Sequence, residues 1–164
     1  MKSIFAPYKP DTQSMLDKCF EIDWESSKIP KLIKGPGQDE IVKAYLKSIY
    51  QTIRETYKYY SGISPLGRVA CIGSSVLTEI LNNCNDFIDG KTLKLPDVDL
   101  QAIACNGGAK STNWLKPDKA LVRCQLMEVL VRLALDKFFK TKIAASHSEA
   151  IQMAFEKHLL PFMA

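Results

Sequence analysis

Apolar residues recur every three or four positions along most of the chain, which is the spacing of one face of an α-helix. The clearest case is residues 39–60, where the apolar positions form one stripe and most basic residues fall on other sides of the helix. The same spacing predicts further helices over about 11–22, 74–84, 95–105, 123–140 and 146–160. No segment has the length and alternation of a strand that could form a sheet. The sequence therefore predicts an all-α protein.

Local signals mark where these helices begin and end. Gly35-Pro36-Gly37 is a firm break before the helix over 39–60, and Asn106-Gly107-Gly108 stops the helix over 95–105. Ser146 followed three positions later by Glu149 is a capping box, which predicts the start of the last helix. Pro161 predicts the end of that helix, because proline lacks the backbone N–H that a helix interior needs.

The middle of the chain repeats one unit. Residues 39–84 consist of a helix, a loop, a few apolar extended residues and a second helix, and residues 95–140 repeat this order. This is the organisation of a pair of EF-hands, and the stretch 39–140 resembles the EF-hand superfamily. The resemblance implies that the segments 69–72 and 120–122 pair as a short antiparallel two-stranded ribbon.

The breaks and helices, together with the resemblance over 39–140, predict an organisation for the whole chain. Residues 1–38 form an N-terminal arm, residues 39–140 form the EF-hand-like helical pair, and residues 141–164 contain a C-terminal helix packed on the core. Ile72 and Leu121, one in each extended segment, are expected to face the core. The arm and the C-terminal helix are expected either to fill the apolar groove of the pair or to bind a partner.

Both loops of the pair lack the ligands of a calcium site. A calcium-binding EF-hand loop supplies oxygen ligands at positions 1, 3 and 5 and a bidentate glutamate at position 12. No aspartate or glutamate lies between Glu55 and Glu79, and Asp118 is the one carboxylate between Asp99 and Glu128. The sequence therefore predicts a pair that does not bind calcium, with no metal ligands and no cofactor.

Two other functions stay open. The region Asp86–Asp99 contains four aspartates and could supply the ligands of a calcium sensor, although apolar and basic residues occupy positions that need oxygens. A small enzyme of unrecognised type is the second alternative. The two histidines, His147 and His158, lie on one expected helix outside any nucleophile signature, and no phosphate-binding glycine motif is present. We therefore expect no catalytic residues and no enzymatic activity.

Composition and charge narrow the class of partner. The chain is 46% hydrophobic and has no run of about 18 apolar residues, so no membrane partner is expected. The net charge of +4 is spread along the chain rather than gathered in a stripe, which argues against a nucleic-acid partner. The five cysteines lie among apolar neighbours without a CxxC motif, as buried thiols of a reducing compartment do. These features predict an intracellular, cytoplasmic protein with a protein partner.

Tyrosines suggest where that partner binds. The helix over 39–60 carries more tyrosines than one core-facing stripe can hold, and tyrosine and arginine are enriched at interface hot spots. We expect Tyr50, Arg54 and Tyr59 to contact a partner, with Phe155 on the C-terminal helix as a further candidate. Boundary tyrosines with their hydroxyls in water are the alternative. The chain is also loosely similar to divergent EF-hand-type proteins of protist cilia and cytoskeleton, which implies a non-enzymatic structural or interaction module of a cytoskeletal or ciliary assembly.

Overall fold

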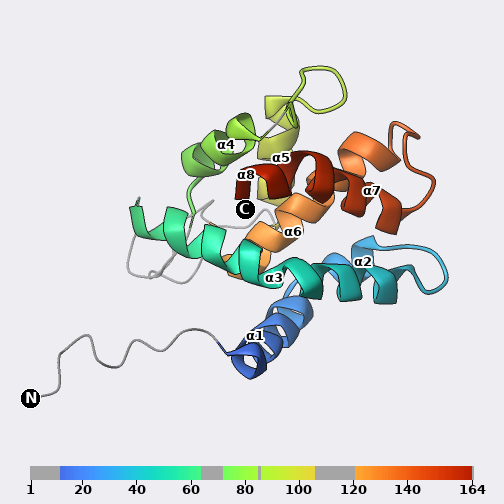
Figure 1. Cartoon of the computed structure of the whole chain (residues 1–164). Coiled ribbons are helices and arrows are strands. Elements are labelled where there is room, and N and C mark those ends of the chain that lie inside the picture. Colours follow the sequence, from blue (N-terminus) through green and yellow to red (C-terminus); the bar gives the residue numbers. More distant parts are fainter. Residues whose placement is uncertain (1–11, 64–71, 85, 106–120, 164) are drawn as a thin grey trace, which may run out of the picture.

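The structure, a computed structural model, describes residues 12–63, 72–84, 86–105 and 121–163. These residues are mostly helical and contain no sheet, which confirms the all-α prediction for the described part of the chain (Figure 1). The helices are α1 (Gln13–Ser26), α2 (Ile29–Leu32), α3 (Gln38–Ile63), α4 (Ser74–Asn83), α5 (Leu95–Cys105), α6 (Arg123–Ala134), α7 (His147–Ala154) and α8 (Leu160–Met163). Two π-helical turns, η1 (Leu135–Phe139) and η2 (Phe155–Leu159), continue α6 and join α7 to α8.

The last helix begins where its capping box predicts but does not end at Pro161. The Ser146 hydroxyl accepts the backbone N–H of Glu149 at 3.3 Å, and the Glu149 carboxylate accepts the N–H of Ala145 at 3.1 Å. Before Pro161 the backbone widens, since the N–H of Leu160 donates to the carbonyl of Phe155, five residues earlier. Proline then occupies the first turn of α8, where its missing N–H costs little. The predicted end at Pro161 is therefore wrong.

Two backbone hydrogen bonds join the loop before α4 to the loop before α6. The N–H of Ile72 donates to the carbonyl of Leu121 and the N–H of Leu121 donates to the carbonyl of Ile72, both at 2.8 Å. They form an antiparallel bridge, and both side chains are buried. The other residues of the two expected segments, apart from Val122 at the start of α6, lie outside the described residues.

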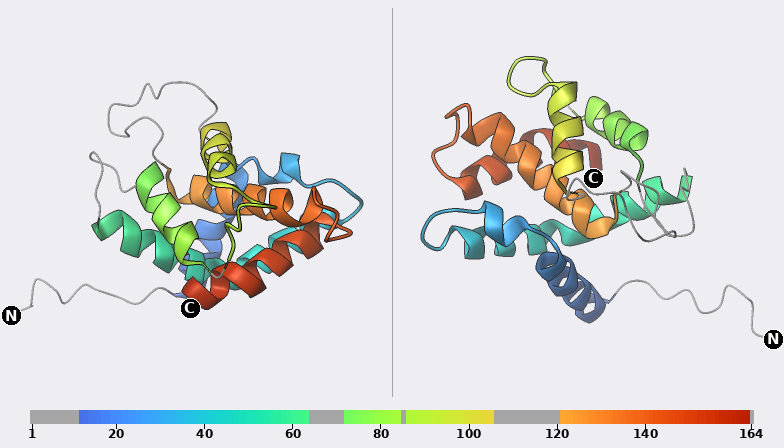
Figure 2. Two further views of the ribbon diagram at one scale, coloured as in Figure 1. Left: turned by 90° about the horizontal axis from the view of Figure 1, so that it is seen from above. Right: turned by 180° about the vertical axis from the view of Figure 1, so that it is seen from behind.

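The hydrophobic core contains residues from the N-terminal arm, from the helical pair and from the C-terminal helix. Phe20 on α1, Ile53 on α3, Leu130 on α6 and Phe155 and Leu159 in η2 are each fully buried members of it. In two further views, α7, η2 and α8 lie alongside α3, and α1 crosses the other side of α3 (Figure 2). The helix α3 is therefore covered from two sides, by the N-terminal arm and by the C-terminal helices.

The start of α7 is attached to the loop before α3 through His147. The Nδ1 atom of His147 accepts the backbone N–H of Lys34 at 2.9 Å, and the imidazole ring lies edge-on to Phe139 with 4.2 Å between ring centroids. His147 is buried at 7% exposure. Protonation of Nδ1 would remove the acceptor that holds these two segments together.

Lowering the pH is therefore expected to destabilise the protein. Burial and the neighbouring Lys34 ammonium lower the pKa of His147 below its ordinary value of 6.5. Because the unfolded chain takes up this proton near pH 6.5 and the folded chain resists it, the free energy of unfolding falls as the pH drops below that value. Urea unfolding at about pH 7 and about pH 5.5 measures the fall.

The matched control is His147→Asn, whose amide oxygen can accept the same N–H but does not titrate. We expect this variant to lose less of its unfolding free energy over the same pH interval. An equal loss in both proteins would mean that His147 does not carry the pH dependence.

Candidate partner-binding surface

The structure separates the four residues predicted to bind a partner. Tyr50 and Phe155 are core residues, exposed by 2% and 0%, so the prediction that they contact a partner from the folded surface is corrected. Arg54 is half-buried on α3. Tyr59 is 62% exposed and is the predicted residue that stands fully on the surface.

The two-sided packing of α3 explains the surplus of tyrosines. Tyr50 faces the arm, where its ring lies edge-on to Phe20 with centroids 5.4 Å apart. Tyr45 faces the C-terminal helices, where its ring lies edge-on to Phe155 at 6.2 Å. Because α1 and α7 cover different sides of α3, more than one stripe of this helix is buried. The number of tyrosines on α3 is therefore not by itself a sign of a partner.

Tyr50 also belongs to a buried polar cluster that joins α1, α3 and α6. Its hydroxyl donates to Oδ2 of Asp23, and Arg123 donates to the same carboxylate from Nε at 2.6 Å and from Nη2 at 3.2 Å. Burial and the hydrogen bond to Asp23 raise the pKa of Tyr50, and the hydrogen bond to Asp23 raises the pKa of Arg123. Tyr50 therefore stays neutral and Arg123 stays charged, as a structural cross-link requires.

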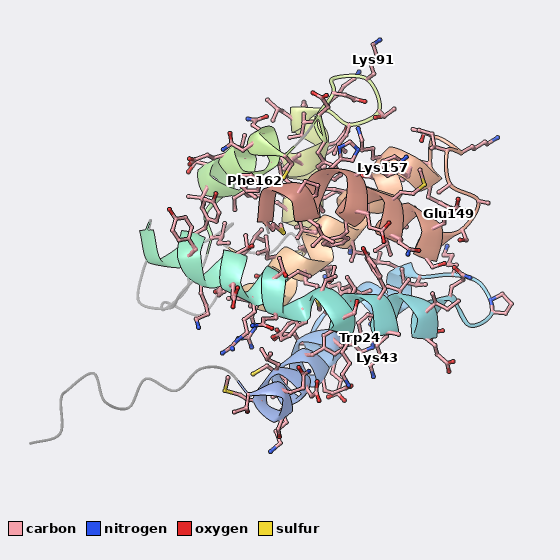
Figure 3. The ribbon with its side chains drawn as sticks, viewed as in Figure 1. Trp24, Lys43, Lys91, Glu149, Lys157 and Phe162 are labelled. Carbon is pink, nitrogen blue, oxygen red and sulfur yellow. The ribbon has the colours of Figure 1, made fainter. Side chains whose placement is uncertain are left out.

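The exposed Tyr59 borders a hollow in the surface where the end of α3 meets α8. The hollow has a volume of about 270 Å³ and is lined by Glu55, Thr56, Tyr59, Tyr60, Phe162 and Met163. We call this set of residues the aromatic hollow. Figure 3 labels Phe162 on α8, near the end of α3. The rings of Tyr59 and Tyr60 are perpendicular with centroids 5.0 Å apart, and the rings of Tyr60 and Phe162 are inclined by 30° at 6.5 Å.

The aromatic hollow combines neutral rings with a carboxylate. Glu55 is exposed and accepts a hydrogen bond from the side chain of Gln51 at 3.3 Å. Burial and then the charge of Glu79 raise the pKa of Tyr60, so its hydroxyl stays protonated at neutral pH. Aromatic rings present a negative face. The hollow can therefore receive an apolar or a positively charged group.

A second exposed apolar surface lies on α5. Leu95, Leu100 and Ile103 are exposed by 44%, 64% and 44%, while Val98 and Ala102 of the same helix are buried. A helix that is apolar on both faces usually has both faces covered. The α5 face is therefore the alternative position for a partner.

The acidic connector is engaged in internal contacts. The carboxylate of Asp89 accepts the backbone N–H groups of Lys91, Thr92 and Leu93 at 2.9, 2.8 and 3.1 Å. It also accepts the Thr92 hydroxyl and the buried Lys137 ammonium, the latter at 3.2 Å. The hydrogen bond from Thr92, followed by those from the backbone, holds the pKa of Asp89 far below its usual range. Within the described residues, no group of three or more His, Cys, Asp and Glu side chains is placed to hold a metal ion.

Calcium is therefore expected to leave the stability of the protein unchanged. A calcium ion at 100 times its dissociation constant would add about 2.7 kcal/mol to the free energy of unfolding. For a domain of this size that is a rise in melting temperature of about 5–10 °C. Thermal melting with millimolar calcium and with a chelator tests this, and a difference of several degrees would favour the calcium-sensor alternative instead.

No family model matches the chain, and neither does any curated protein or solved structure. Across the parts of the chain that the structure describes, no helix combines the length and apolar character needed to cross a membrane. The geometry of the described residues therefore carries the functional proposal.

Sequence reasoning missed most of the aromatic hollow and all of the α5 face. Phe162 and Met163 follow Pro161, which predicts the end of the last helix, so the sequence pattern assigns them to no helix face. Leu100 and Ile103 were detectable, because helical spacing puts them away from the buried Val98.

Proposed function

We propose that the chain is a non-enzymatic protein–protein interaction module built on an EF-hand-like pair of helix–loop–helix units that works without calcium. The Ile72–Leu121 bridge supports the scaffold, because an EF-hand pair joins its two loops side by side in this way. The loops that this bridge joins lack the carboxylates of a calcium site. Membership of a cytoskeletal or ciliary assembly stays a prediction from the resemblance.

The C-terminal helices act as a permanent internal ligand of the pair. An EF-hand pair can offer an apolar groove to a partner helix. Here α7 packs against α3, α6 and η1, and Ile151 of α7 and Phe155 and Leu159 of η2 are completely buried. A partner therefore binds on the outer surface rather than in the groove.

The aromatic hollow is the observation that carries the interaction function. Tyr59 stands 62% exposed at its edge, beside Tyr60 and Phe162. Exposed tyrosines held by neighbouring rings are typical of interface hot spots, because they supply a large contact area with few rotatable bonds. The partner is expected to cover Tyr59.

Replacing Tyr59 by alanine is expected to weaken partner binding by about tenfold or more, which corresponds to about 1.4 kcal/mol. The free energy of unfolding should change by about 0.5 kcal/mol or less, because the side chain is exposed. A photo-crosslinking amino acid at position 59 in the source cells identifies the bound protein. Calorimetry with the purified partner then compares the two affinities, and thermal melting checks the fold.

The matched control is Leu100→Ala, which truncates a similarly exposed residue on the α5 face. It should leave the affinity unchanged. If Leu100→Ala weakens binding while Tyr59→Ala does not, the partner binds to α5 and the proposed surface is wrong. A large loss of stability in Tyr59→Ala would make this tyrosine structural.

A further inference from the structure

Three aromatic rings and a carboxylate meet in the aromatic hollow. Tyr59, Tyr60 and Phe162 line it and are in ring contact, Tyr59 with Tyr60 and Tyr60 with Phe162, and Glu55 lines it from one turn earlier on α3. The charge of Glu79 on α4 also acts on Tyr60. A cation is attracted to the faces of aromatic rings, most strongly when a negative charge lies nearby.

The size of the hollow limits what it can hold. Its volume of about 270 Å³ lies below the roughly 300–1,000 Å³ of pockets that bind drug-sized molecules. It is open on the surface beside the exposed Tyr59. It therefore suits one long side chain that enters from a partner rather than a whole small molecule.

The charges around the hollow favour a positive group. Among the described residues, its lining includes one acidic side chain, that of Glu55, and no basic one, since Arg54 and Lys58 of the same helix are not part of it. The hydroxyl of Thr56 is directed to the backbone, since it donates to the carbonyl of Thr52 at 2.9 Å. Of the described residues, the carboxylate of Glu55 and the aromatic rings are therefore the groups that a cation would meet.

We propose that the aromatic hollow binds the positively charged side chain of a lysine or an arginine of the partner. This inference rests on the proposed function, because it names the chemical group that the same surface receives. The side-chain cation lies against the rings and close to the carboxylate of Glu55.

The test uses the full chain and two probes that differ only in the charged group. Nα-acetyl-lysine amide carries the ammonium, and Nα-acetyl-norleucine amide has the same carbon chain without it. Met163 lines the hollow, so its methyl group is the reporter of binding by NMR in protein labelled at methionine methyls. Met163→Leu assigns its signal among the five methionines. We expect a saturable shift in the millimolar range with the lysine probe and binding about fivefold weaker or more with norleucine.

Two variants locate the cation. Glu55→Gln keeps the size of the side chain and should weaken binding of the lysine probe by about threefold. Tyr59→Leu keeps an apolar side chain and should weaken it by about threefold or more. Leu100→Ala, on the α5 face, should leave it unchanged. Thermal melting confirms that each variant is folded.

Equal binding of the two probes would overturn the inference, because the hollow would then be an apolar site. So would the absence of a saturable shift with the lysine probe. The outcomes also separate this inference from the proposed function. If the lysine probe binds as expected but Tyr59→Ala leaves partner affinity unchanged, the proposed interaction surface fails and the cation site stands. If Tyr59→Ala weakens partner binding but the two probes bind equally, the proposed cation site is wrong and the proposed interaction surface stands.

Discussion

Replacing Phe155 by alanine is expected to lower the free energy of unfolding by about 4 kcal/mol. Phe155 in η2 is completely buried, and its ring packs edge-on against Tyr45 of α3 with centroids 6.2 Å apart. Removing the ring loses its burial and leaves a cavity. For a domain of this size the loss corresponds to a fall in melting temperature of about 8–16 °C. Urea and thermal unfolding measure both quantities.

Phe162→Ala is the matched control, because it removes the same side chain from the same end of the molecule. Phe162 is only half-buried on α8, so its replacement should lower the free energy of unfolding by about 1 kcal/mol. If Phe155→Ala cost no more than this, the C-terminal helix would be a detachable extension, free to bind a partner, rather than part of the core.

Replacing Asp23 by alanine is expected to lower the free energy of unfolding by about 3 kcal/mol. The change leaves the guanidinium of Arg123 and the hydroxyl of Tyr50 without the carboxylate that both now contact. The Asp23 side chain is 8% exposed and that of Arg123 is 28% exposed, so water can compensate Arg123 only in part. Equilibrium unfolding in urea measures the loss.

Glu21→Ala provides the comparison for an exposed ion pair on the same helix. Glu21 contacts Lys43 at 2.9 Å, but the two side chains are 43% and 37% exposed. Exposed ion pairs contribute about 0–1 kcal/mol to the free energy of unfolding. The free energy of unfolding of Glu21→Ala should therefore be close to that of the unmodified protein. If Asp23→Ala and Glu21→Ala lowered the free energy of unfolding by similar amounts, the polar cluster of Asp23, Tyr50 and Arg123 would not cross-link α1 to α6.

Several features of this protein follow from short stretches of sequence. The helical spacing of apolar residues predicted the positions of the six long helical segments, because a helix depends on residues three and four apart. Ser146 and Glu149 predicted the start of α7 for the same reason, since the cap is built within one turn. The missing calcium ligands are likewise a property of the sequence alone, since Asp118 is the one carboxylate in the two loops.

Other features required contacts between distant residues. The sequence contains Asp23, Tyr50 and Arg123, but nothing local indicates that segments up to 100 residues apart bring them together. It shows too many tyrosines on α3 without showing which of them are buried, because that depends on α1 and α7 covering different sides of the helix. The surplus of tyrosines therefore predicts a surface position for Tyr50, which is wrong because Tyr50 is buried.

The candidate site shows the same division. Its exposed Tyr59 could be selected from the sequence, because tyrosines in surplus on a helix predict that some are exposed. Phe162 could not be selected from the sequence, because the widened backbone of η2 continues the helix through Pro161 and places α8 against the end of α3. The sequence by itself determined the helices and the missing calcium ligands, which depend on neighbouring residues. Only the tertiary structure decided which aromatic side chains are buried and which meet at the surface, because burial depends on the helices packed around each residue.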